Sequence, residues 1–264
     1  MNPYFLYSSF GFYLVAGVLY LLQFVFTKAP LSKTAFRCTL VAWILQSILL
    51  GFTFFQVGYP FLISSEISYL FTAWVAVFAF VLLNIRQRLQ IVGALVLPVA
   101  STFYLLALFS STSYSEESSA LMHSPWASVH IMFSFLALAI FSLSFVLGIM
   151  FIIEEFQLKY KVLPKVFLKM PSLDSLETVH AKALSVGFIL LTGGIITGAG
   201  WARNVTGFYF FEDARQLWAI IAWLIYALFL QSRWLAGWRG RRGVLLSLLG
   251  FVVILFTFLG VEHG

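Results

Sequence analysis

The sequence is poor in charge and in cysteine. Only 10% of its 264 residues are Asp, Glu, Lys or Arg, whereas soluble proteins carry about 25%. Hydrophobic residues make up 61% of the chain, and the mean hydropathy is +0.97. The single cysteine, Cys38, excludes an internal disulfide and a thiol relay. The composition predicts an integral membrane protein. It excludes a nucleic-acid-binding protein, which would need a solvated basic face outside the short loops.

Eight apolar runs are long enough to cross a bilayer as helices, since about 20 residues at 1.5 Å each span its ~30 Å core. We place them at residues 4–26, 35–57, 65–86, 91–110, 125–153, 180–202, 214–236 and 243–261. The first run has neither a basic start nor a small-residue cleavage site, so we expect it to remain as a helix. The predicted fold is an all-α, polytopic membrane protein that forms one domain over residues 1–264.

The basic residues alternate between loops. All Lys and Arg residues except Arg203 and Arg215 lie in or beside the first, third, fifth and seventh loops. Loops rich in Lys and Arg stay in the cytoplasm. We therefore predict that both termini, and the loop between the sixth and seventh runs, lie outside the cytoplasm. The predicted location of the protein is the inner (plasma) membrane of the cell. The basic loops are expected to face anionic membrane lipids.

The loop between the sixth and seventh runs is rich in rings. It holds six aromatic residues (Trp201, Phe208, Tyr209, Phe210, Phe211, Trp218), two acids (Glu212, Asp213) and two arginines (Arg203, Arg215). Composition alone leaves two interpretations open. The loop is either part of the aromatic belt that Trp and Tyr form at membrane interfaces, or a platform on which rings stack against a flat ligand while arginine pairs with its carboxylates.

This loop, with the preceding segment from Gly187 to Ala202, resembles the cytochrome c assembly membrane proteins of the CcsA type, beside which stand HemX-like and YpjD-like branches. The tryptophan-rich haem loop of that family reads W-G-x-Y-W-x-W-D-P-K-E-T-W, where residues 206–218 here read T-G-F-Y-F-F-E-D-A-R-Q-L-W. Gly207, Tyr209, Asp213 and Trp218 match the family, and Arg215 stands for its lysine. The resemblance is specific from about Pro125 to the end of the chain.

Among the four histidines, His130 is the strongest ligand candidate. It lies about one turn inside the membrane from Trp126, where an ionisable side chain is a functional candidate. The alternative is a neutral imidazole bonded to a carbonyl or to Ser134. The resemblance implies that His130 is an axial ligand of haem iron, for which imidazole is well suited. His263 is near the family's second outer ligand but is not aligned with it, and His123 is a lesser substitute.

The resemblance thus implies a non-covalent b-type haem, with His130 as the metal ligand. The residues expected to bind the cofactor are His130, Gly207, Tyr209, Phe210, Phe211, Asp213, Arg215, Trp218 and His263. Binding should be weak because tryptophans of the family loop are replaced here, two of them by Phe210 and Glu212. The family's intramembrane histidine is Gln231, which removes a second haem site. The sequence assigns no catalytic residue.

Three functions follow from this resemblance. The first is handling of haem for cytochrome c assembly, as one subunit of a haem lyase complex with a larger extracytoplasmic partner. The second is a HemX-like regulator of haem synthesis. The third is a YpjD-like accessory subunit of an ion-transport system that holds no haem, although polar residues within the spans are too few for a transport path.

Two further features concern the sixth run. Its glycines at 187, 193, 194, 198 and 200 recur at a spacing that lets helices pack closely, which would hold the aromatic loop still. His180 stands where the family has asparagine, and we interpret it as a residue at the start of that helix, outside the haem pattern.

Overall fold

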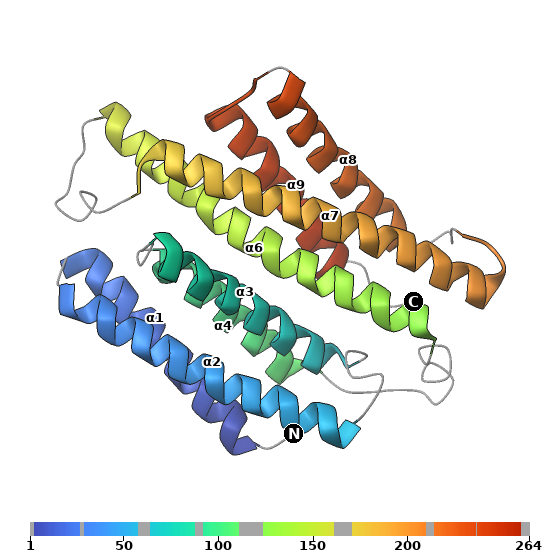
Figure 1. Ribbon diagram of the computed structural model, residues 1–264, viewed down its shortest axis with the longest axis horizontal. Helices are drawn as coiled ribbons and strands as arrows, with labels where there is room; N and C mark the ends of the chain where they lie inside the picture. Colours follow the sequence, from blue (N-terminus) through green and yellow to red (C-terminus); the bar gives the residue numbers. More distant parts are fainter. Residues whose placement is uncertain are drawn as a thin grey trace. The chain divides into compact units, whose positions relative to one another are not determined.

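The computed structural model describes residues 3–26, 29–57, 64–87, 92–110, 124–160, 171–209, 214–235 and 237–259. Within these ranges the chain forms eight α-helices and no strand (Figure 1). The helices are α1 (Pro3–Phe26), α2 (Ala29–Val57), α3 (Ser65–Gln87), α4 (Gly93–Phe109), α6 (Pro125–Tyr160), α7 (Leu173–Thr206), α8 (Ala214–Leu235) and α9 (Arg241–Leu259). The predicted all-α class is confirmed.

Seven of these helices are long and apolar enough to cross a membrane. The eighth, α4, has 17 residues and is interrupted by no charge. At 1.5 Å per residue it covers about 25 Å, the lower end of what a bilayer core requires. The chain is a multi-pass membrane protein, as the sequence predicted.

Helices α6 and α7 extend furthest beyond the apolar runs that predicted them. The run ending at residue 153 continues as helix to Tyr160, and the run expected from residue 180 begins at Leu173. Apolar residues mark the part of a helix that lies in hydrocarbon, whereas hydrogen bonding carries the helix on through residues such as Glu154 and Glu177. With 36 and 34 residues, α6 and α7 exceed the ~30 Å core of a bilayer by several turns.

The described chain forms two compact units. The first contains residues 1–112 and 153–172, and the second contains residues 113–152 and 173–264. A single domain over residues 1–264 remains a prediction.

In the first unit, buried polar side chains join helices α1 to α4. The Tyr13 hydroxyl donates to Gln46 Oε1 at 2.6 Å, and Gln46 Nε2 donates to the Leu70 carbonyl at 2.9 Å. The hydroxyls of Ser9 and Tyr104 lie 2.5 Å apart. An unpaired polar group costs several kcal/mol in hydrocarbon, so these bonds hold particular helix pairs together.

In the second unit, α6 to α9 pack around a central pair of rings. Phe141 of α6 stacks on Tyr226 of α8 with centroids 4.2 Å apart and planes within 4°. Gly187 of α7 lies against Phe141, where a Cβ atom would come within 2.7 Å of the ring. Gly250 of α9 receives Tyr226 in the same way, at 2.9 Å. The stack therefore links all four helices of this unit.

Helices α6 and α7 run antiparallel (Figure 1). Rings of α6 lie against glycines of α7 along the helix pair. The pairs, with the distance from an added Cβ to the ring, are Trp126 and Gly200 (3.1 Å), His130 and Gly198 (2.8 Å), Phe133 and Gly193 (3.2 Å), and Phe141 and Gly187 (2.7 Å). We call these four pairs the ring–glycine seam. The predicted role of the glycines in helix packing is confirmed, with the addition that they accommodate rings.

Candidate functional site

His130 lies in the second turn of α6, half-buried against α7. Its Nδ1 atom is 2.7 Å from the backbone carbonyl oxygen of Gly194. Its ring stacks on the indole of Trp201, with centroids 6.3 Å apart and planes 21° apart. Both partners belong to α7, so α7 sets the position of the imidazole.

The hydrogen bond of His130 fixes which ring nitrogen carries the proton. A carbonyl oxygen only accepts, so Nδ1 must be the donor. A neutral imidazole has one N–H, which leaves an unshared electron pair on Nε2. No described residue bonds to Nε2. The sequence offered a hydrogen bond to a carbonyl as the alternative to metal ligation, and this bond is present. It does not exclude ligation, because it leaves Nε2 suited to a metal ion.

The aromatic loop begins later than the sequence predicted. Helix α7 continues through Trp201 to Thr206, because the backbone N–H of Gly207 still bonds to the carbonyl of Arg203, at 2.9 Å. At Gly207 the chain turns with φ of 82°, a left-handed conformation that favours glycine. This is a physical reason for the glycine at the start of the loop. Trp201 is consequently a helical residue that faces His130.

The described start of the loop is exposed. Phe208 is 74% exposed and Tyr209 is 51% exposed. The guanidinium of Arg203 lies 4.6 Å from the centroid of the Tyr209 ring and donates a hydrogen bond to its hydroxyl. Tyr209 and Arg203 therefore form a pair at the end of α7.

Two more predicted residues lie in the first turns of α8. Arg215 is half-buried and lies within electrostatic range of His130. Trp218 contacts Phe256 of α9 edge to face, with centroids 4.9 Å apart. The structure thus brings His130 and Trp201 together, with Arg215 in electrostatic range of His130. Phe210, Phe211, Asp213, His263 and His123 lie outside the described residues.

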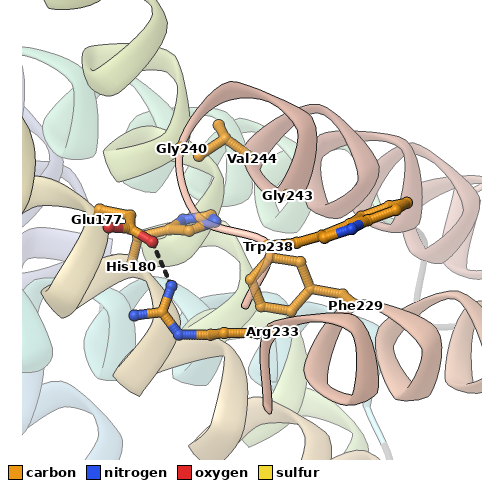
Figure 2. Close-up of a pocket in the computed structure, with 8 residues that line it drawn as sticks. All are labelled: Glu177, His180, Phe229, Arg233, Trp238, Gly240, Gly243 and Val244. Carbon is orange, nitrogen blue, oxygen red and sulfur yellow. Dashed lines mark hydrogen bonds and ion pairs between the residues drawn. The ribbon is translucent and has the colours of Figure 1, made fainter. Parts of the chain in front are cut away.

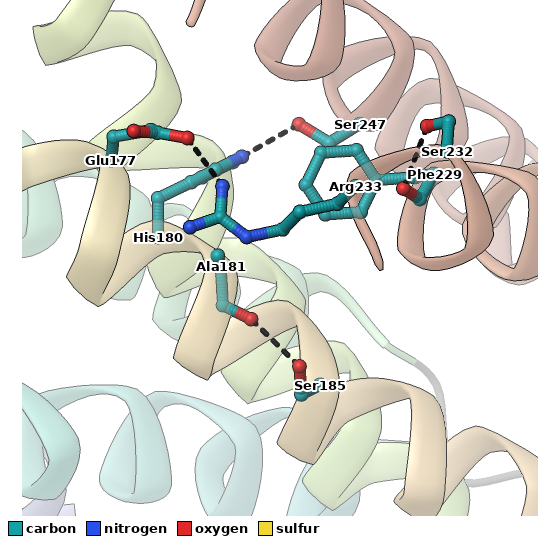
Figure 3. Close-up of polar contacts among 8 residues, drawn as sticks. All are labelled: Glu177, His180, Ala181, Ser185, Phe229, Ser232, Arg233 and Ser247. Atoms are coloured by element: carbon teal, nitrogen blue, oxygen red, sulfur yellow. Dashed lines mark hydrogen bonds and ion pairs between the residues drawn. The ribbon is translucent and has the colours of Figure 1, made fainter. Parts of the chain in front are cut away.

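A second polar cluster lies around His180, and here the interpretation of a helix-start residue is wrong. His180 is 1% exposed and lies two turns inside α7, which begins at Leu173. Its Nδ1 atom is 2.9 Å from the carbonyl oxygen of Ser144 on α6. Its Nε2 atom is 2.9 Å from the hydroxyl of Ser247 on α9, as Figure 3 shows. Both ring nitrogens are therefore engaged, which leaves none for a metal.

An ion pair between Glu177 of α7 and Arg233 of α8 lies beside His180 (Figure 3). A narrow hollow borders this pair and is lined by Glu177, His180, Phe229, Arg233, Trp238, Gly240, Gly243 and Val244 (Figure 2). Through His180 and the ion pair, the cluster connects all four helices of the second unit. We define His180, Ser144, Ser247, Glu177 and Arg233 as the His180 cluster.

The described part of the chain contains no group of three or more His, Cys, Asp and Glu side chains that could hold a bare metal ion. A haem iron needs fewer protein ligands than a bare metal ion, because the porphyrin supplies four nitrogen ligands and the protein supplies only the axial ones. His130 fits that requirement, because no described residue bonds to its Nε2 atom, the Trp201 indole stacks on its ring and Arg215 lies in electrostatic range.

Comparison with known sequences identifies relatives over nearly the whole chain. Residues 62–264 match the family described as "Cytochrome C assembly protein". The "Cytochrome c biogenesis protein CcsA" of Pyropia yezoensis is 30% identical, over 96% of this chain and 92% of that protein. The protein of the same name in Guillardia theta is 27% identical, over 94% of this chain and 89% of that protein. The similarity therefore extends well before Pro125, where the sequence resemblance became specific.

Among solved structures, the "Cytochrome c Heme Lyase CcmF" superposes with a TM-score of 0.72 at 15% identity. The match covers 98% of this chain and 46% of CcmF, so the chain spans about half the length of that protein. At this identity the comparison shows a shared fold. With the sequence matches, it leads to one conclusion: the chain is a multi-pass membrane protein that belongs to the cytochrome c assembly protein family.

Proposed function

We propose that this protein binds b-type haem non-covalently at the extracytoplasmic face of the inner membrane and presents it for cytochrome c assembly. In this proposal His130 is an axial ligand of the iron through Nε2. Bound haem would supply the cofactor that a c-type cytochrome carries.

The observation that carries the proposal is the hydrogen bond from His130 Nδ1 to the Gly194 carbonyl. A ligating histidine in a metalloprotein usually donates its second ring N–H to such an acceptor, which fixes the tautomer and raises the basicity of the ligating nitrogen. His180, whose two nitrogens both have protein partners, lacks this arrangement. The support is therefore specific to one of the two described histidines.

Residues beside His130 and in the first turns of α8 suit the remaining parts of haem. The indoles of Trp201 and Trp218 offer flat apolar surface, and aromatic pairs contribute about 0.5–1.5 kcal/mol each beyond burial. Arg215, in electrostatic range of His130, is suited to a propionate carboxylate. Tyr209, Phe210, Phe211, Asp213, Gly207 and His263 remain proposed members of the site.

We further propose that the protein acts as one subunit of a haem lyase complex, together with a larger extracytoplasmic assembly subunit. This proposal draws on the names of its relatives, a cytochrome c biogenesis protein and a cytochrome c haem lyase.

Haem titration of the purified protein tests the haem assignment. Wild-type protein should be purified with substoichiometric haem and should acquire a low-spin absorption spectrum when haem is added. His130→Ala should lose that spectrum while remaining folded. A wild-type protein that never acquires the spectrum, or a His130→Ala protein with an unchanged one, would exclude His130 as the ligand.

The orientation in the membrane needs a separate test, because His130 and the aromatic loop are placed outside the cytoplasm by loop charge alone. Reporters fused after Gly264 and within residues 111–122 should report outside, and a reporter within residues 159–169 should report inside. A cytoplasmic C-terminus would reverse the proposed face for haem.

A further inference from the structure

We infer that Gly194 and Gly198 are positioning residues for His130: the carbonyl of the first and the absent side chain of the second hold the imidazole as the Nδ1–H tautomer with Nε2 available to iron. The inference rests on the proposed function and names the part of α7 that prepares the ligand.

The Gly194 carbonyl is placed to accept this second hydrogen bond. Inside a helix a carbonyl oxygen accepts the N–H four residues on, and its second lone pair remains for another donor. The Thr197 hydroxyl competes for that lone pair at 3.1 Å, but its shorter bond, 2.7 Å, goes to the Gly193 carbonyl. The lone pair on Gly194 is thus left to His130, whose Nδ1 is closer, at 2.7 Å.

Gly198 makes this approach possible. A Cβ atom at residue 198 would lie 2.8 Å from His130 Nδ1 and 2.9 Å from its Cε1. Such contacts are shorter than side chains make, so any other residue would push the imidazole away from α7 and lengthen the bond to Gly194. The bare Cα of Gly198 is therefore part of the support of the ligand.

Trp201 completes the support, since its indole lies along the imidazole plane at 6.3 Å between centroids. Gly194, Gly198 and Trp201 lie on successive turns of α7, so one rigid helix sets the height, the plane and the tautomer of the ring. A ligand held in this way needs no rearrangement to meet iron. A hydrogen bond from Nδ1–H also makes Nε2 a stronger donor, which favours ferric iron.

The matched variants are Gly198→Ala and Gly193→Ala. Both add one methyl group to α7 in tight contact with a ring of α6, but residue 193 faces Phe133, at 3.2 Å, and not the histidine. Gly198→Ala should weaken haem binding by about 10–100-fold, the usual effect of losing the outer partner of a ligating histidine. It should also reduce the low-spin fraction and make the iron potential more positive. Gly193→Ala should bind haem within about threefold of wild type, since it leaves that partner in place.

A second measurement does not depend on haem or on the folding of a variant. In haem-free wild-type protein with ¹⁵N-labelled histidine, the His130 resonances, assigned by their loss in His130→Gln, should show a protonated Nδ1 and an unprotonated Nε2. The opposite tautomer would overturn the inference, as would equal haem affinity and potential in Gly198→Ala and wild type. If the tautomer is as expected but wild type binds no haem, the positioning by α7 stands and the proposed haem function fails.

Discussion

The two described histidines both lie between α6 and α7, and in both Nδ1 meets a backbone carbonyl of the opposite helix. They differ in the partner of Nε2. His130 on α6 donates from Nδ1 to a carbonyl of α7 at 2.7 Å, and His180 on α7 places Nδ1 2.9 Å from a carbonyl of α6. The second nitrogen of His180 meets the Ser247 hydroxyl at 2.9 Å. No described residue meets the second nitrogen of His130.

This difference separates structure from function. A buried histidine with both nitrogens bonded joins three helices, and removing it breaks the side-chain bonds between them. A half-buried histidine with one nitrogen bonded is held in place but still has a lone pair to offer. On this antiparallel helix pair, His180 therefore has a structural role at one end, and His130 is suited to bind a metal at the other.

The largest effect should come from the ion pair of the His180 cluster. Arg233→Ala leaves the carboxylate of Glu177, itself largely buried, without its partner, and breaking a buried pair costs about 3–5 kcal/mol. Because the Arg233 side chain is 18% exposed, we expect the lower end of that range, about 3 kcal/mol. Thermal unfolding in detergent measures it. Arg239→Ala, on an exposed residue nearby, is the control and should change stability little; equal stability of the two variants would contradict the structural role.

His180→Ala should lower stability more than His130→Ala, whereas His130→Ala should impair haem binding more than His180→Ala. His180→Ala creates a cavity and removes the bonds to Ser144 and Ser247, at a cost of about 2 kcal/mol, because both serine hydroxyls keep another acceptor. His130→Ala removes one hydrogen bond from a half-buried site, at about 1 kcal/mol. His180→Ala should nevertheless keep the low-spin spectrum per folded molecule, which His130→Ala loses. If His180→Ala abolishes the low-spin spectrum and His130→Ala does not, the assignment of His180 as structural and His130 as ligand is wrong.

Trp218 allows a smaller, graded test of the site near His130. Trp218→Ala removes one flat ring near the start of α8, and aromatic contacts of this kind contribute about 0.5–1.5 kcal/mol beyond burial. Haem affinity should fall by about tenfold, the equivalent of 1.4 kcal/mol. The control is Trp234→Ala, on the same helix but 73% exposed near its other end. Equal affinities in a haem titration would place Trp218 outside the site.

The fold was predictable because lipid requires long apolar helices, and the runs in the sequence have that length. The ends of α6 and α7 were not, since a helix continues through polar residues once it leaves the hydrocarbon. A helical signal for the burial of His180 was available: Leu176, Val179 and Leu184 place an apolar face around it, and all three are buried.

The hydrogen-bond partners of the histidines could not be predicted from the sequence. The segments carrying His180 and Ser247 are far apart in the chain, and a serine within an apolar run gives no sign of which helix it will meet. The glycines of α7 predicted close packing, but which ring each would receive depends on the register of α6 against α7. His130 was found from its depth in the membrane and from the family resemblance, and its tautomer only from the carbonyl of Gly194.

The smallest effect should come from Tyr209→Phe, which asks whether Arg203 belongs to the haem site. The change removes the hydroxyl that accepts from Arg203 but keeps the ring 4.6 Å from its guanidinium, so a cation–π attraction of about 0.5–1 kcal/mol remains. If Arg215 pairs with the propionate, as its electrostatic range to His130 favours, haem affinity should stay within about twofold of wild type, because the exposed bond between Arg203 and Tyr209 contributes little. A change of about fivefold or more, roughly 1 kcal/mol, would instead assign the propionate to Arg203.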